Sequence, residues 1–406
     1  LAGEFDFIET LVFFEEQALP DSLAYDLFTA EQPGSDDSGK LTEARASVKG
    51  TDPAMIVYTS GTTGDPKGAL IPHQGLSRVA HVQKRYWNCN PIRAINFLPI
   101  NHLGCVGDIA CFTYVDGGTI VFMEQFDPAA CLQVIQDEKV TFWGAVPTAF
   151  QLCLALPDFD DYDLSCLQLV IWGGAKAPTT LIRKLAAICP RLSTSFGQTE
   201  SVGSVTFVEP SLNVELLSRS VGQPVPEYGF RLADEKGNPV PTGKTGEIQV
   251  QGDFIMLGYW ENSEATEEAI QDGWLRTGDL GVQGDDGHVR LVGRLKEMFI
   301  SGGYNVFPLE IEQTLESHPG IAMAAVVSVP DDLFSEVGHA WVLLEPGFTI
   351  STDEIIGFCK TQLANYKVPK QIFTEYELPM LPIGKLDRSA LKERSLEALK
   401  PKRETK

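Results

Sequence analysis

The 406-residue sequence contains 43% hydrophobic and 21% charged residues, which is typical of a globular protein with two or three domains. Its 55 acidic residues outnumber its 32 basic residues, and a net charge of −23 has the wrong sign for binding nucleic-acid phosphates. No apolar run approaches the roughly 18 to 20 residues that would span a bilayer. We therefore expect neither a nucleic-acid partner nor a transmembrane segment.

The eight cysteines are scattered between Cys89 and Cys359, without a C-x-x-C pair or histidines at zinc-binding spacing. Isolated thiols of this kind are typical of a reducing compartment. The first residues, LAGEFDFIET, lack the basic start of a secretion signal. These features predict a cytoplasmic protein.

The first predicted elements are a buried strand at residues 5–14 and a loop at 31–40, where Pro, Gly, Ser and Asp are frequent. Short apolar runs then alternate with segments of helical spacing between residues 55 and 207. Strands alternating with helices indicate an α/β layer with a largely parallel sheet. The pattern predicts strands at 119–123, 140–146 and 167–175, and helices at 128–139 and 178–190.

Short strands separated by turn signals occupy residues 208–294, which predicts a small β-rich, barrel-like subdomain. The pattern changes again after residue 295. Helices are expected at 308–320 and 352–366, and strands at 321–331, 339–347 and 370–379. The predicted fold class is α/β, with a large N-terminal domain of mostly parallel sheets, the β-rich subdomain, and a mobile α+β C-terminal domain.

The segment YTSGTTGDPKG, residues 58–68, follows an apolar run and combines glycines, hydroxyls and a lysine. Backbone N–H groups of a Gly-rich turn form an anion site, to which hydroxyls add donors and a lysine adds charge. The segment is not a Walker loop, because Lys67 stands between Pro66 and Gly68. On composition alone, an ordinary surface loop is the alternative.

Four further motifs follow in order: SFGQTE at 195–200, WLRTGDL at 274–280, GRLKEMFISGGYNVFPLEIE at 293–312 and PIGKLDR at 382–388. Together with the Gly-rich segment, this set resembles the adenylate-forming superfamily, which includes acyl-CoA synthetases, over residues 55–388. The resemblance implies a two-step reaction. A carboxylate attacks the α-phosphate of ATP and releases pyrophosphate, and a nucleophile then displaces AMP.

The resemblance also implies roles for individual residues. Thr199 would bind the α-phosphate and Glu200 would hold Mg²⁺, a hard cation that prefers oxygen ligands. Asp279 and Arg294 would contact the ribose, and Lys385 would stabilise the charge that develops during adenylation. The ATP site would further include Thr59, Ser60, Gly61, Thr62, Thr63, Gly64 and Lys67 around the phosphates, and Gly173, Gly174, Ala175 and Phe196 around the adenine, with Gly197 and Gln198 also binding the nucleotide.

By the same resemblance, Lys296 is the hinge between an AMP-binding domain of residues 1–295 and a small C-terminal domain of residues 296–406. Gly302 and Gly303 would leave space for the thiol arm of coenzyme A. His102 either borders the acyl pocket as a catalytic gate or is a plain loop histidine.

The expected activity is that of an ATP- and Mg²⁺-dependent acyl-CoA synthetase, acting on a medium, long-chain or aryl carboxylic acid. Two alternatives stay open: an adenylating enzyme with another acceptor, and an inactive nucleotide-binding remnant. The second alternative arises because only 57 residues precede Tyr58, fewer than the family usually carries. The sequence names neither the acid nor the oligomeric state, and a homo-oligomer is possible.

Overall fold

The computed structural model describes residues 12–13, 23–25, 37–59, 66–345, 347–380 and 386–399. The chain forms two compact units, residues 1–52 and 53–406. In the first unit, β1 (Val12–Phe13) pairs in parallel with β2 (Leu23–Ala24), and α2 spans Asp37–Ser47. The loop predicted at 31–40 is wrong for residues 37–40, because Lys, Leu, Glu, Ala and Arg further along this helix favour helical structure. Residues 5–11 and 31–36 lie outside the described residues.

The second unit begins with an antiparallel hairpin of β3 (Pro53–Thr59) and β4 (Lys67–Pro72), followed by α3 (His73–Tyr86). The other edge of β4 pairs with residues 257–260, far along the chain. The Leu70 N–H donates to the Gly258 carbonyl over 2.9 Å, and the Trp260 N–H donates to the Gly68 carbonyl over 2.7 Å. This hairpin is therefore tied to the β-rich part of the chain.

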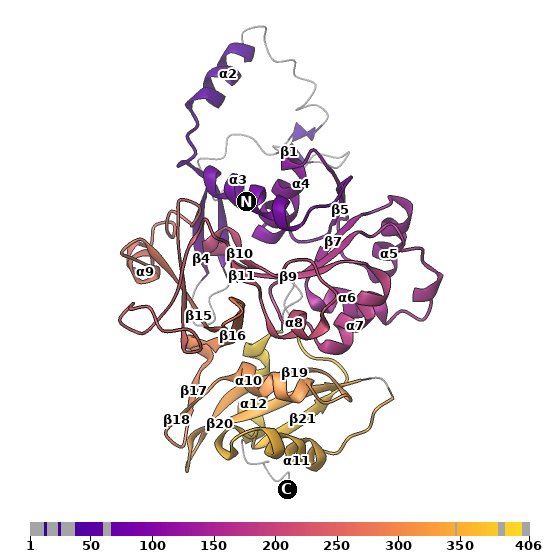
Figure 1. The fold of residues 1–406 in the computed structure, drawn as a ribbon, viewed down its shortest axis with the longest axis vertical. Coiled ribbons are helices and arrows are strands. Elements are labelled where there is room, and N and C mark those ends of the chain that lie inside the picture. The colour runs from indigo at the N-terminus through magenta and orange to yellow at the C-terminus, as the bar shows by residue number, and fades with distance from the viewer. Residues whose placement is uncertain are drawn as a thin grey trace. The chain divides into compact units, whose positions relative to one another are not determined.

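A seven-stranded sheet forms the centre of the second unit (Figure 1). Its order is β11-β10-β9-β8-β7-β5-β6, and β5 to β9 are parallel, as predicted. The strands at 119–123, 140–146 and 167–175 are confirmed with shorter bounds. The seven strands are β5 (Arg93–Asn96), β6 (Thr119–Phe122), β7 (Phe142–Ala145), β8 (Leu169–Trp172), β9 (Leu192–Gln198), β10 (Gly203–Phe207) and β11 (Gln223–Pro224).

Helices cover both faces of this sheet. On β7, Phe142 packs into one apolar cluster together with α3, and Trp143 packs into a second cluster with four other helices. Successive side chains of a strand point to opposite faces, so the fully apolar run of β7 reflects burial on both sides. The helices are α4 (Phe112–Val115), α5 (Pro128–Asp137), α6 (Pro147–Leu154) and α7 (Thr179–Ile188), and a π-helix spans Gly104–Cys111.

The predicted β-rich subdomain is confirmed as a five-stranded antiparallel sheet with the order β12-β13-β15-β14, in which β16 also pairs with β15. Buried side chains of β13, such as Ile248 and Val250, join the same core as the hairpin and α3. The elements are α8 (Val214–Arg219), β12 (Gly229–Ala233), β13 (Thr245–Gln251), α9 (Ser263–Ala269), β14 (Ile270–Gln271), β15 (Trp274–Gln283) and β16 (Val289–Arg294).

The C-terminal region has the predicted α+β composition, with a sheet of order β18-β17-β20-β19 and with β21 parallel to β20. One face packs on α10 and α11 and the other on α12, which the sequence analysis did not predict. The elements are β17 (Phe299–Ser301), β18 (Tyr304–Val306), α10 (Pro308–Glu316), β19 (Ile321–Asp331), β20 (Ser335–Leu344), α11 (Thr352–Gln362), β21 (Gln371–Glu375) and α12 (Arg388–Leu399).

Within the described ranges, no helix is both long and apolar enough to cross a membrane. All eight cysteines are free, as expected.

Candidate active site

A single cavity of about 1450 Å³ brings together most of the predicted site residues that the structure describes. Two predicted residues, Gly302 and Gly303, do not line it. Ser60, Gly61, Thr62, Thr63, Gly64 and Lys385 lie outside the described residues. The predicted residues that line the cavity are Thr59, Lys67, His102, Gly173, Gly174, Ala175, Phe196, Gly197, Gln198, Thr199, Glu200, Asp279, Arg294 and Lys296.

The turn between β9 and β10 carries Thr199 and Glu200. It is a single helical turn that ends at Val202, whose φ of 55° is left-handed. The Ser201 hydroxyl accepts from the Gln198 N–H over 2.9 Å and fixes the turn. A β-carbon at position 197 would lie 2.0 Å from the Gly203 carbonyl oxygen, so only glycine fits there. The tight turn holds Thr199 and Glu200, two of the predicted catalytic residues, at the cavity wall.

Glu200 has a specific partner that the sequence analysis missed. The Tyr259 hydroxyl donates to Glu200 Oε1 over 2.8 Å, and Lys67 Nζ lies 5.3 Å from the centre of the Tyr259 ring. Burial, and then the Glu200 charge, raise the pKa of Tyr259, so it is a neutral donor at physiological pH. Tyr259 belongs to the segment that pairs with β4. That pairing thus joins the Gly-rich hairpin to the carboxylate predicted to hold the metal.

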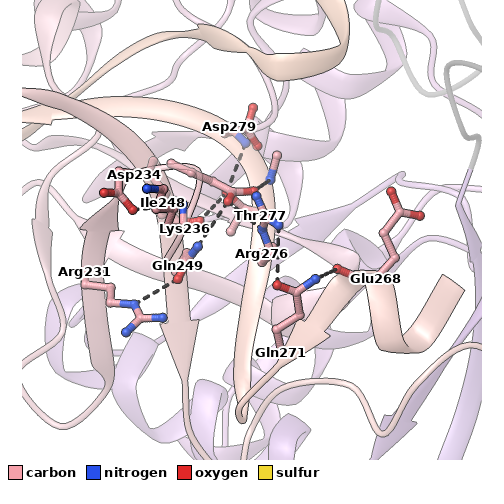
Figure 2. Close-up of polar contacts among 12 residues, drawn as sticks. Arg231, Asp234, Lys236, Ile248, Gln249, Glu268, Gln271, Arg276, Thr277 and Asp279 are labelled. Atoms are coloured by element: carbon pink, nitrogen blue, oxygen red, sulfur yellow. Dashed lines mark hydrogen bonds and ion pairs between the residues drawn. The ribbon is translucent and has the colours of Figure 1, made fainter. Parts of the chain in front are cut away.

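Asp279 and Arg294 face each other across paired strands. Arg294 Nε lies 3.0 Å from Asp279 Oδ1, and the two residues are register partners on β15 and β16. The attraction of Asp279 is the largest cause that raises the pKa of Arg294. The Asp279 N–H donates to the Thr277 hydroxyl, which itself donates to the Ile248 carbonyl over 2.7 Å (Figure 2). Asp279 is therefore a carboxylate fixed at the cavity edge.

The sequence analysis also missed a buried carboxylate, Glu247, on the strand that pairs with β15. Glu247 on β13 is 4% exposed and accepts from Arg276 Nε over 2.8 Å and from the Gly278 N–H over 3.1 Å. Arg231 on β12 donates to Gln249 of the same layer (Figure 2). These bonds hold the TGD segment at residues 277–279, where the pairing of β15 with β13 is irregular. No short motif marks Glu247, because its role depends on strand pairing across the sheet.

Gly173, Gly174 and Ala175 follow directly after β8, beside the end of the parallel strand β9. Gly174 has a φ of 75°, a conformation that favours glycine. Phe196, near the end of β9, is 8% exposed and lines the same cavity. Ligands of open α/β sheets bind outside the carboxyl ends of strands, and this is where the predicted adenine-binding residues lie.

The remaining predicted residues lie in different settings. His102 precedes the π-helix at 104–111, and its Nδ1 accepts from the Gly104 N–H over 3.0 Å. Lys296 lies in a single helical turn, Leu295–Glu297. Gly302 and Gly303 form the turn between β17 and β18, with φ values of 57° and 86°. Their roles as gate, hinge and CoA-binding glycines stay predictions.

Glu200 suits a magnesium ion that is held mainly by a nucleotide. Among the described residues, no group of three or more His, Cys, Asp or Glu side chains could enclose a metal. Mg²⁺ is commonly bound through one or two carboxylates together with substrate phosphates and water. Glu200, as one carboxylate on the cavity wall, fits that arrangement.

Comparison with known proteins identifies the family. The model of the AMP-binding enzyme family matches residues 12–260, and the model of the AMP-binding enzyme C-terminal domain matches residues 310–385. Feruloyl-CoA synthase of an Amycolatopsis species is 36% identical over 353 residues, which cover 84% of this chain and 70% of that protein.

Two solved structures have the same fold. The anthranilate CoA ligase AuaEII, in complex with anthranoyl-AMP, has a TM-score of 0.83 at 26% identity. The match covers 98% of this chain and 75% of the AuaEII chain. The amide bond synthetase McbA from Marinactinospora thermotolerans has a TM-score of 0.76 at 30% identity, and the match covers 84% of this chain and 69% of the McbA chain. The chain therefore belongs to the AMP-binding enzyme family and is of the acyl-CoA synthetase type.

Proposed function

We propose that this protein is an ATP-dependent carboxylate–CoA ligase that forms an acyl-adenylate and then an acyl-CoA thioester. The observation that carries the proposal is the single cavity in which Thr199, Glu200, Asp279 and Arg294 meet. Curated relatives that are named CoA ligases support this assignment, among them the indoleacetate–CoA ligase of Aromatoleum aromaticum, at 33% identity. We propose a medium, long-chain or aryl acid as the substrate.

In the first step, a carboxylate oxygen of the acid bonds to the α-phosphorus of ATP, and the bond to the β-phosphate oxygen breaks as pyrophosphate leaves. Thr199 and Glu200 lie on one tight turn, so a hydroxyl donor and a metal-binding carboxylate can reach one phosphate region together. Bound Mg²⁺ would neutralise phosphate charge there. Tyr259 keeps Glu200 oriented, and Lys67 adds a positive charge beside them.

Asp279 and Arg294 hold the sugar in this proposal. The Asp279 carboxylate can accept from ribose hydroxyls because the bond of its N–H to Thr277 and the pairing with β16 fix its position. In the second step, the sulfur of coenzyme A bonds to the acyl carbon, the thiol proton goes to solvent, and AMP leaves. Lys296, Gly302 and Gly303 belong to this step, and Lys385 to the first.

One specific observation favours a second acceptor. McbA, a structural relative at a TM-score of 0.76, is named an amide bond synthetase. An amine could therefore replace coenzyme A as the nucleophile.

We also propose a cytoplasmic location. ATP, Mg²⁺ and CoA are supplied by the cytoplasm, and eight free cysteines agree with that reducing compartment.

The test is acid-dependent exchange of labelled pyrophosphate into ATP with Mg²⁺, over short, medium, long-chain and aryl acids. Addition of coenzyme A, or of an amine, with AMP as the readout, then identifies the acceptor. Exchange followed by CoA-dependent AMP release supports the ligase. AMP release with the amine alone favours amide synthesis, and no exchange with any acid from folded protein supports the inactive remnant.

A further inference from the structure

Asp108 is a carboxylate inside the cavity that has no role in the reaction described above. It lies on the π-helix Gly104–Cys111 and lines the same cavity as Thr199 and Glu200, to which its side chain is partly exposed. π-helical segments are rare, and they occur frequently at functional sites. Its position therefore calls for an explanation in terms of a ligand.

The surroundings of Asp108 offer little to balance a charge. Within the described part of the chain, its one hydrogen-bond partner is Gln83 of α3, whose Nε2 donates to Oδ1 over 2.5 Å, and no lysine or arginine forms an ion pair with it. Burial raises the pKa of Asp108 to about 7, and the Gln83 bond only partly offsets this effect. Apolar side chains that line the same cavity include Trp87, Leu103 and Ile109. Among the described residues, this carboxyl group has one hydrogen-bond donor and no cation to balance its charge.

Gln83 also has an oxygen that lacks a hydrogen-bond donor. It is fully buried, and its Oε1 has no hydrogen-bond partner among the described residues. An apolar side chain would be the usual occupant of such a position, because a buried polar atom without a partner is costly. Among the described residues, Gln83 Oε1 therefore has no donor, and Asp108 has only the bond from Gln83 Nε2.

On the strand that faces Asp108, a glycine leaves space for the carboxyl group. Gly203, the first residue of β10, has a φ of 115°, and a β-carbon there would lie 2.7 Å from Asp108 Oδ1. Gly203 follows the turn that carries Thr199 and Glu200 by only a few residues. An acid whose carboxylate meets the α-phosphate near Thr199 can thus extend its far end toward Asp108 within the one cavity.

We propose that Asp108 selects carboxylic acids that carry a hydrogen-bond donor, a hydroxyl or an amino group, at the end remote from the reacting carboxylate. The inference rests on the proposed ligase function and names the substrate class of that site. A hydroxyl would donate to the Asp108 carboxylate, and an ammonium group would also neutralise its charge. An acid with a purely apolar end would leave Asp108 with Gln83 as its one donor among the described residues.

The experiment compares acids matched in shape, with and without the donor: cinnamate with 4-hydroxycinnamate, benzoate with 4-hydroxybenzoate and 4-aminobenzoate, and hexanoate with 6-hydroxyhexanoate and 6-aminohexanoate. The readout is kcat/KM for pyrophosphate exchange. Sites built to hydrogen-bond a substrate reject analogues that lack the group by large factors. We expect the wild-type protein to favour a donor-bearing member by roughly 10-fold or more.

Two variants locate the effect. Asp108→Leu should reverse the preference. Asp108→Asn should retain the hydroxy acids and 4-aminobenzoate, whose arylamine is neutral, and should lose 6-aminohexanoate selectively, because only that acid carries an ammonium group. The matched control is Asp137→Asn on α5, because Asp137 also accepts from a glutamine, Gln133, but on the exposed surface. It should leave every ratio unchanged. ATP binding by calorimetry and thermal unfolding verify that each variant is folded.

The outcomes separate the two proposals. Exchange that favours the apolar acids in the wild type, or ratios that Asp108→Leu and Asp108→Asn do not alter, would overturn the selection by Asp108 and leave the ligase intact. No exchange with any acid would overturn the ligase, and with it this inference.

Discussion

Removing the Arg388 side chain should destabilise the C-terminal region severely. Arg388 begins α12, and its Nη1 and Nη2 lie 2.5 Å and 2.9 Å from the two carboxylate oxygens of Glu312 on α10. Nη1 also donates to the Val326 carbonyl of β19 over 3.1 Å, and Glu312 accepts from the Val326 N–H over 2.7 Å. One guanidinium thus connects two helices and the sheet of the C-terminal region.

The expected magnitude follows from the burial of the partner. Burial is the largest single effect and opposes the charged form of Arg388, but the attraction and hydrogen bonds of Glu312, together with the charges of Glu297 and Glu316, outweigh it and raise the pKa of the guanidinium. Glu312 is only 4% exposed, so Arg388→Ala would leave its carboxylate buried without a cation. Breaking such a pair costs about 3 to 5 kcal/mol, and we expect about 3 because part of Arg388 is solvent-exposed.

Hydrogen exchange measures this loss locally, which matters in a chain of several domains that does not unfold in one step. A loss of about 3 kcal/mol corresponds to amide exchange roughly 100-fold faster in α10, β19 and α12. Arg394→Ala on the exposed face of α12 is the control and should change exchange little. Equal protection in the two variants would refute the importance of the buried pair. The double substitution Arg388→Met with Glu312→Leu should recover most of the stability.

Three further outcomes are expected. Tyr259→Phe should lower the rate of adenylation about 10-fold, measured by pyrophosphate exchange, because it removes the donor to Glu200; an unchanged rate at limiting Mg²⁺ would contradict the orienting role. Lys385→Ala should abolish adenylation but spare thioester formation from a supplied acyl-adenylate, and equal loss of both steps would argue against separate roles. Because the folded pKa of Asp108 is raised to about 7, its contribution to stability is lost as pH rises toward 8. Asp108→Asn should therefore gain melting temperature relative to the wild type between pH 5 and pH 8; a constant difference, or one that follows the titration of the neighbouring Cys111, would exclude this assignment.

The sequence allowed the layered α/β architecture to be predicted because the apolar runs of β7 and β8 are short and buried on both faces. The motif residues Thr199, Glu200, Asp279 and Arg294 could be identified because each stands in a short local pattern. These residues meet in one cavity, but their roles stay predictions.

Other parts of the site depend on contacts that no local pattern records. Tyr259 reaches Glu200 only because residues 257–260 pair with β4, and Glu247 supports the TGD segment from a neighbouring strand. No helix or strand was predicted around Asp108, and the π-helix that contains it could not be predicted from 3.6-residue periodicity. Long-range packing, and not propensity, decides these positions.

The pairing of β4 with residues 257–260 also has a consequence for biosynthesis. The strand that leads out of the Gly-rich segment stays with one open edge until about 190 further residues have left the ribosome, which takes roughly 10 to 40 s at usual elongation rates. Until then the nascent chain carries an unpaired strand edge, a template for wrong associations. The nucleotide site is therefore completed late in synthesis, and chaperone demand should be greatest during that interval.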